Sequence, residues 1–119
     1  MKTNSFLILL LILALPVFVQ AQDKVVTANI KVYGNCGMCK SRIEKALDHK
    51  GIKKATWNTK SKMLEVIYVP SKITESKIHE LVASVGHDTD KAKAKDTVYG
   101  KLPYCCLYRD HDHSGITDN

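Results

Sequence analysis

The stretch Tyr33-Gly34-Asn35-Cys36-Gly37-Met38-Cys39-Lys40 places two cysteines three positions apart in a glycine-bearing loop. An alternating run over residues 25–33 predicts a strand before this loop, and a helical pattern over residues 39–50 follows it. We therefore expect Cys36 in the loop and Cys39 in the first turn of the helix. A helix N-terminus lowers a thiol pKa, and a thiolate is the better metal ligand and the better nucleophile. The spacing alone leaves three interpretations open: soft-metal binding, thiol–disulfide exchange and a structural disulfide.

Residues 1–21 have the pattern of a secretory signal peptide. Lys2 supplies the positive charge, and residues 6–19 form an apolar run. Val19-Gln20-Ala21 has small residues at the two positions that a signal peptidase recognises. The apolar run is short for a spanning helix. The sequence thus predicts cleavage after Ala21 and a periplasmic or secreted protein that is not embedded in a membrane.

Composition limits what the mature chain can be. Removing 21 of the 119 residues leaves about 98, enough for one domain with a modest core. The net charge of the whole chain is +6, but its lysines are scattered, which is typical of a solvated surface and argues against a nucleic-acid partner. All four cysteines lie in the mature chain, so disulfides compete with metal binding in an oxidising compartment.

The order of the predicted elements indicates the fold class. Residues 52–58 and 63–69 predict a hairpin, and a second helix is expected between an N-cap at Thr74 and a stop at Gly86. Residues 87–94 could add a short fourth strand. The resulting β-α-β-β-α-β order predicts an α+β, ferredoxin-like sandwich.

Other residues are assigned places within this fold. Gly51 is expected to stop the first helix as its C′ residue. Trp57 and Tyr68 are expected in the sheet and core, and Met38 is expected to anchor the loop from within the core. Residues 96–119 are predicted to be a short C-terminal extension that contains cysteines and histidines.

The sequence resembles the heavy-metal-associated domain family over residues 25–91. That family includes copper chaperones, the N-terminal modules of copper ATPases and a periplasmic mercury-binding protein. The resemblance is carried by residues 34–47 around the two cysteines, and by Lys53-Lys54-Ala55, Met63-Leu64-Glu65-Val66 and Val85-Gly86-His87-Asp88. It implies a ferredoxin-like fold in which Cys36 and Cys39 bind one soft metal ion.

Three positions depart from the family's pattern. Gly34-Asn35 stands where Met-Thr or Met-His often precedes the first cysteine, and His87 stands where bacterial members often have tyrosine. His87 is either an additional metal ligand, because the final loop of this fold lies beside the cysteine loop, or an ordinary surface residue. The C-terminal Cys105-Cys106 pair lies outside the resemblance altogether.

Cys105 and Cys106 have three interpretations: a second soft-metal site, additional ligands of the first site, or a disulfide. Their neighbours Leu102, Tyr104 and Tyr108 are too apolar for a free tail, so the segment is expected to dock near the metal loop. His111-Asp112-His113 could hold Cu(II) or Zn(II) loosely, but a terminal tail is the favoured interpretation.

These observations predict a non-enzymatic, exported metal-binding protein. It is expected to bind Cu(I), with Hg(II), Zn(II) or Ag(I) as alternatives, and to pass the ion to a partner or sequester it. A metal-transporting membrane protein or another metal-binding domain is the expected partner. The alternatives are a thiol–disulfide oxidoreductase that attacks with Cys36, and an interaction module with structural disulfides.

Overall fold

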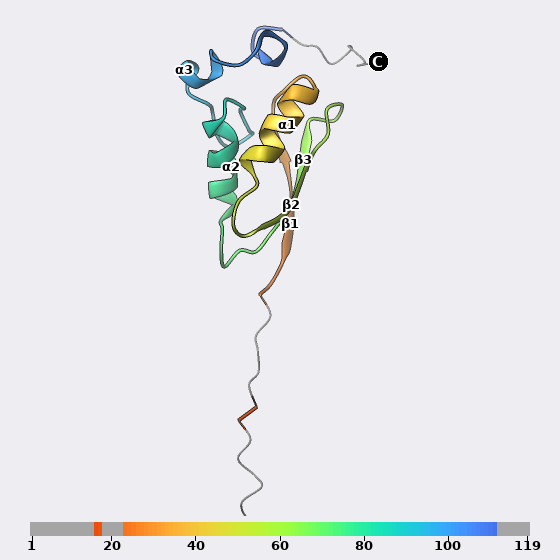
Figure 1. Cartoon of the computed structure of the whole chain (residues 1–119), viewed down its shortest axis with the longest axis vertical. Helices are drawn as coiled ribbons and strands as arrows, with labels where there is room; N and C mark the ends of the chain where they lie inside the picture. Colours follow the sequence, from red (N-terminus) through yellow and green to blue (C-terminus); the bar gives the residue numbers. More distant parts are fainter. Residues whose placement is uncertain (1–15, 18–22, 112–119) are drawn as a thin grey trace, which may run out of the picture.

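A computed structural model describes residues 16–17 and 23–111 (Figure 1). The elements are, in chain order, β1 (Val26–Lys31), α1 (Gly37–Ala46), β2 (Ile52–Trp57), β3 (Met63–Tyr68), α2 (Glu75–Ser84), α3 (Asp96–Tyr99) and the 3-10 turn η1 (Tyr104–Cys106). Nearly all of the expected signal peptide, and His113 of the expected tail, lie outside the described residues. Within the described part of the chain, no helix is long and apolar enough to cross a membrane.

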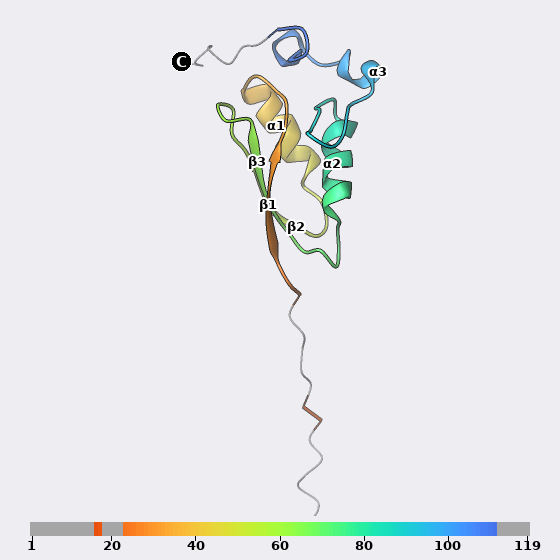
Figure 2. The same cartoon turned by 180° about the vertical axis from the view of Figure 1, so that it is seen from behind.

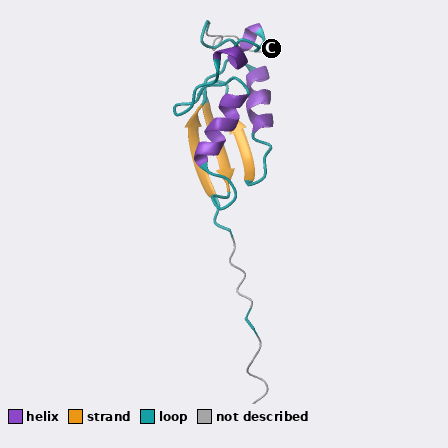
Figure 3. Ribbon diagram, turned by 90° about the vertical axis from the view of Figure 1, so that its left-hand side faces the viewer, coloured by secondary structure: helices purple, strands orange, loops and turns teal. Residues whose placement is uncertain are grey.

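The described strands form one antiparallel sheet in the order β1-β3-β2. The central strand β3 pairs with both neighbours, so that Val66 lies opposite Ala28 on one side and opposite Ala55 on the other. Both α1 and α2 cover the same face of this sheet (Figures 1 and 3). The predicted α+β, ferredoxin-like fold is confirmed.

The core lies between the sheet and the two helices. Alternate residues of each strand point into it, which is why Ile30, Leu64 and Val66 are buried whereas Glu65 is exposed. Trp57 and Tyr68 are also buried, as expected. Burying a large apolar side chain stabilises a fold by roughly 1.5–3 kcal/mol, so these residues supply much of the energy that fixes the sheet under α1.

The expected fourth strand is reduced to a single bridge between Val32 and Thr89. A tight turn ends the pairing at this point. The Thr89 hydroxyl accepts hydrogen bonds from the backbone N–H groups of Lys91 and Ala92, and the Thr89 N–H donates to the Ala92 carbonyl at 2.8 Å. The prediction of a strand over residues 87–94 was therefore too long. The N–H groups of Lys91 and Ala92 donate to the Thr89 side chain, and so they are not available for pairing with a neighbouring strand.

The predicted ends are correct for helix α2 but not for helix α1. Helix α2 has Thr74 as its N-cap, whose side chain accepts from Lys77 N–H at 3.1 Å, and Gly86 follows its C-cap with a φ of 104°. Both predictions for α2 are confirmed. Helix α1 ends earlier than expected, with Leu47 as its C-cap. Gly51, with a φ of 93°, instead lies just before β2, where an added Cβ would approach Lys72 to 2.9 Å.

The C-terminal extension folds back across one end of the domain. Figures 1 and 2 show α3 and η1 beyond the end of the sheet at which α1 begins. Leu102 and Cys106 are buried in the main hydrophobic cluster. The extension is therefore packed on the domain close to the cysteine loop.

Candidate metal centre

Helix α1 positions the first two sulfur atoms. Cys36 is the N-cap residue with an extended backbone, and its carbonyl accepts the first helical hydrogen bond, from Lys40 N–H at 3.1 Å. Cys39 lies in the first turn and is buried on the same helix face as Ile43, one turn later. The two Sγ atoms are 3.8 Å apart. The predicted placement of the pair at a helix start is confirmed.

The loop before α1 is held close to the sheet by Trp57. The indole Nε1 donates to the Val32 carbonyl at 3.1 Å. An added Cβ at Gly34 would lie 3.0 Å from the Trp57 ring and 3.2 Å from the Cys39 Cβ. Gly34 is therefore required for a close approach, and the rigid indole fixes the loop that carries Cys36.

A third sulfur comes from the C-terminal extension. The Sγ atom of Cys106 is 3.9 Å from that of Cys36, and the ligand atoms of Cys36, Cys39 and Cys106 all lie within 4.8 Å of one another. Cys39 and Cys106 are fully buried, whereas Cys36 is partly exposed. All four cysteines are free thiols, so neither the loop nor the extension is closed by a disulfide.

Cys105 and Met38 lie beside this group but outside it. The Cys105 Sγ contacts the Met38 Sδ at 3.4 Å, and Met38 is 53% exposed. The expectation that Met38 is buried in the core is therefore wrong. Since Cys39 and Ile43 occupy the inward face of α1, the preceding residue is rotated by about 100° toward solvent.

The helix terminus and neighbouring groups act on the pKa of Cys36. Burial alone raises the pKa of this thiol, but hydrogen bonds from the Cys39 backbone, the Cys105 side chain and the Met38 backbone together bring it below its ordinary value. In contrast, burial and the nearby Cys39 thiol raise the pKa of Cys106, although Arg42 opposes them. Without a metal, these surroundings favour ionisation of Cys36 over that of Cys106.

Arg42 is a contact of the site that the sequence analysis did not single out. It projects from α1 one turn beyond Met38, and its Nη1 donates to the Cys106 Sγ at 3.2 Å. Nothing in the local sequence distinguishes it from the other basic residues of the helix. Its role depends on a residue 64 positions away.

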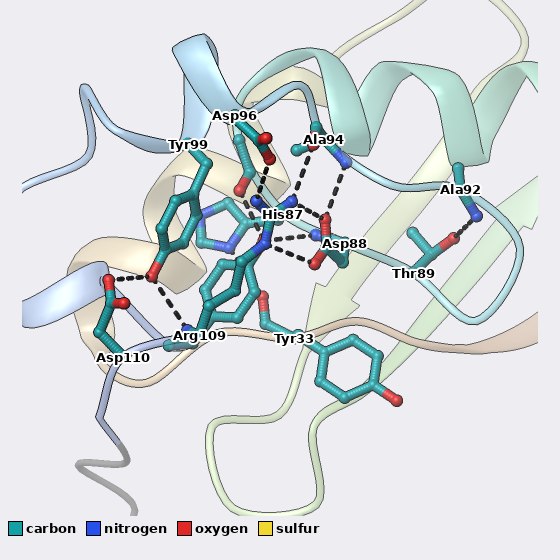
Figure 4. Close-up of polar contacts among 12 residues, drawn as sticks. Tyr33, His87, Asp88, Thr89, Ala92, Ala94, Asp96, Tyr99, Arg109 and Asp110 are labelled. Carbon is teal, nitrogen blue, oxygen red and sulfur yellow. Dashed lines mark hydrogen bonds and ion pairs between the residues drawn. The ribbon is translucent and has the colours of Figure 1, made fainter.

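His87 does not join the sulfur group. Its Nδ1–H donates to the Tyr33 carbonyl at 2.8 Å (Figure 4). Its ring stacks on Tyr108, and its Nε2 is buried without a hydrogen-bond partner. Burial lowers the pKa of His87 to about 4. The side chain is fully buried, so the surface-residue interpretation was wrong, and its place in the structure is a packing position under the extension.

The ion pair between Arg109 and Asp88, seen in Figure 4, and the hydroxyl of Tyr108 hold the extension onto the domain. Two guanidinium nitrogens of Arg109 donate to the two carboxylate oxygens of Asp88, at 2.7 and 2.9 Å, and one of them also donates to the Ala94 carbonyl at 2.8 Å. The Tyr108 hydroxyl donates to the Gly86 carbonyl at 2.7 Å and accepts from Asp88 N–H at 2.8 Å. These contacts seat the extension on the loop that follows α2.

A second attachment joins the extension to the cysteine loop itself. The side-chain amide of Asn35 donates to the Cys105 carbonyl at 3.3 Å and to the His111 carbonyl at 3.0 Å. The ring of His111 stacks on Tyr104, with a centroid separation of 4.4 Å. His111 thus belongs to the docked extension in this structure.

Comparison with known proteins places the domain that carries Cys36 and Cys39 in a family. The profile of the heavy-metal-associated domain family matches residues 35–88. The solved structure of the CopZ metallochaperone is 30% identical, covering 54% of this chain and 98% of that chain with a TM-score of 0.52. The N-terminal domain of a potential copper-translocating P-type ATPase from Bacillus subtilis, in its Cu(I)-loaded state, is 26% identical over 63% of this chain and 96% of that chain, with a TM-score of 0.54.

Oxidised MerP from Ralstonia metallidurans CH34 shares the fold at 20% identity, covering 56% of this chain and 96% of that chain with a TM-score of 0.54. A search among curated protein sequences gave no significant match. The matched family region ends at residue 88, before the extension that carries Cys106.

Proposed function

Because this chain belongs to the heavy-metal-associated domain family, we propose that it is an exported protein that binds Cu(I) through Cys36 and Cys39. The ion is cargo, which the protein passes to a partner or sequesters. The observation that carries the proposal is the pair of free thiols, 3.8 Å apart, at the start of α1.

The chemistry of the sulfur atoms favours a soft ion. Thiolates select Cu(I) and related thiophilic ions over hard cations such as Mg²⁺. A relative of similar fold has been solved in a Cu(I)-loaded state, which supports Cu(I) above Hg(II), Ag(I) and Zn(II). The protein is a carrier in this proposal, and it catalyses no reaction.

The relatives also suggest the kind of partner. One is a metallochaperone and another is the N-terminal domain of a P-type ATPase. We therefore propose a metal-transporting membrane protein, or another metal-binding domain, as donor or acceptor. Export follows from the N-terminal signal pattern, and N-terminal sequencing of the mature protein tests it by asking whether the chain begins at Gln22.

Anaerobic titration with Cu(I) against a chromogenic Cu(I) chelator tests the main proposal. We expect tight binding that the Cys36→Ser and Cys39→Ser variants each abolish, whereas Lys101→Ala, an exposed change in the extension, leaves the titration unaltered. Unchanged affinity in both serine variants would overturn the proposal.

An insulin-reduction assay separates this function from thiol–disulfide exchange. The depressed pKa of Cys36 suits a nucleophile, so the oxidoreductase alternative has a specific basis. Catalysed reduction that requires Cys36 but not copper would favour that alternative. We expect only background rates, because the element order lacks the parallel crossover of thioredoxin-like proteins.

A further inference from the structure

We propose that Cys106 is a third metal ligand, and that residues 96–111 form a clamp that holds this sulfur over the pair on α1. The inference rests on the proposed function, because it concerns the ion that Cys36 and Cys39 bind. Cys106 lies outside the region that matches the family, because that region ends at residue 88.

The spacing of the sulfur atoms fits a three-coordinate site. A metal–sulfur bond of ~2.3 Å sets the sulfurs of a planar three-coordinate site ~4.0 Å apart, whereas a linear two-coordinate site needs ~4.6 Å. The Cys36 Sγ lies 3.8 Å from that of Cys39 and 3.9 Å from that of Cys106. Both separations match the three-coordinate arrangement, and the third, between Cys39 and Cys106, is within 4.8 Å.

The burial of Cys106 and the cation beside it suit a metal ligand that stays in place. Its side chain is fully buried, so the sulfur cannot turn away to solvent. Three thiolates around one Cu(I) carry two negative charges in excess, and such charge is costly in a buried site unless a cation is near. The Arg42 guanidinium, 3.2 Å from the Cys106 Sγ, supplies that cation.

The clamp is attached to two different parts of the domain. Arg109 pairs with Asp88, and Tyr108 bonds to the loop after α2. Asn35, which directly precedes Cys36, donates to the carbonyl groups of Cys105 and His111. Cys106 lies between these attached residues in the chain, which keeps its sulfur in place.

The same geometry distinguishes Cys106 from its neighbour. Cys105 is adjacent in sequence and its sulfur lies 3.9 Å from that of Cys106, but it points toward Met38 and is not part of the group whose ligand atoms all lie within 4.8 Å of one another. Cys105→Ser makes the same substitution in the same turn η1, so comparison with Cys106→Ser shows which of the two sulfurs binds the ion. The structure assigns different roles to two adjacent cysteines that the sequence leaves equivalent.

The clamp changes how the ion can leave. A ligand on the same chain acts at an effective concentration of roughly millimolar or more, so a partner thiol must compete with Cys106 for the third position. Exchange then proceeds as substitution: one incoming sulfur–metal bond forms while the Cys106–metal bond breaks, with no change in oxidation state. The clamp thus favours retention of the ion until a partner displaces it.

X-ray absorption of the Cu(I)-loaded full-length protein gives the first test, because it counts the sulfur neighbours directly. We expect three sulfur neighbours in the unaltered protein and in Cys105→Ser, and two in Cys106→Ser. Two neighbours in the unaltered protein overturn the inference whether or not any variant folds. Three neighbours in Cys106→Ser overturn it as well.

Retention against a chelator gives the second test. We expect Cys106→Ser to bind one Cu(I) but to hold it roughly 100-fold less tightly, as expected when a tethered ligand is lost. Equal retention in Cys105→Ser and Cys106→Ser overturns the inference while the proposed function stands. Full retention in Cys36→Ser instead overturns the proposed function, so the two failures are distinguishable.

Discussion

Arg109→Lys should loosen the clamp while the domain beneath it stays folded. Lysine keeps the positive charge but cannot bond to both oxygens of Asp88 at once, and it also loses the bond to the Ala94 carbonyl. Hydrogen bonds to charged groups contribute about 1.5–3 kcal/mol each, and neutral ones about 1 kcal/mol. The Arg109 side chain is 20% exposed, so we take a value near the lower end, about 2 kcal/mol.

The assay is the rate at which a thiol reagent modifies Cys106 in the metal-free protein. Local opening that is easier by about 2 kcal/mol raises the open population roughly 30-fold, and the modification rate should rise by the same factor. The reaction is followed by mass spectrometry of the digested protein, so that Cys36 and Cys106 are counted separately. Lys101→Ala, an exposed change in the same clamp, is the control and should leave the rate unchanged.

A Cys106 rate that is unchanged in Arg109→Lys, with normal circular dichroism, would refute this reasoning. It would mean that the ion pair contributes nothing to docking, and that apolar contacts such as Leu102 hold the clamp by themselves. A fall in the melting temperature with no change in the Cys106 rate would point to global unfolding instead.

Two further predictions concern the loop after α2. The pKa of His87 is about 4 in the folded protein and 6.5 ordinarily, so the unfolded chain binds more protons in between, and stability should fall by about 3 kcal/mol as the pH drops from 6.5 to 4. Urea unfolding across that range checks this, and a His87→Gln variant that shows the same loss would contradict it. Gly86→Ala should destabilise the protein by about 1–2 kcal/mol, because φ is 104° and the new Cβ would meet Leu102 at 3.0 Å. An unchanged melting temperature would show that the loop and clamp can shift to accommodate the methyl group.

The sequence carried most of the information on the fold, because local patterns there agreed with one another. Alternation marked β1, the hairpin pattern marked β2 and β3, the Thr74 cap and Gly86 marked α2, and the cysteine loop marked the start of α1. The predictions failed where contacts with residues distant in the sequence outweighed the local pattern. Gly51 looked like a helix stop, but its conformation serves the packing of Lys72 and Ile73 against the start of β2.

The site was only partly predictable for a related reason. Docking of the extension near the metal loop was expected from its apolar residues, and the contact between Cys106 and Cys36 confirms it. The choice between Cys105 and Cys106 depends on the turn η1, which aims adjacent side chains in different directions. The burial of His87 depends on Tyr108, which is 21 positions further along the chain, so no window around His87 could show it.

The three sulfur atoms lie very unequally along the chain, which sets the order in which they can assemble. Cys36 and Cys39 are 3 residues apart, whereas Cys106 is 70 residues from Cys36. Closing a long loop costs more chain entropy than closing a short one, and that cost is met here by folding of the sheet and helices in between. A nascent chain therefore has its two-sulfur pair long before the third sulfur arrives. Copper bound early would be held by two ligands, and the third would join only after the chain had been made and folded as far as the clamp.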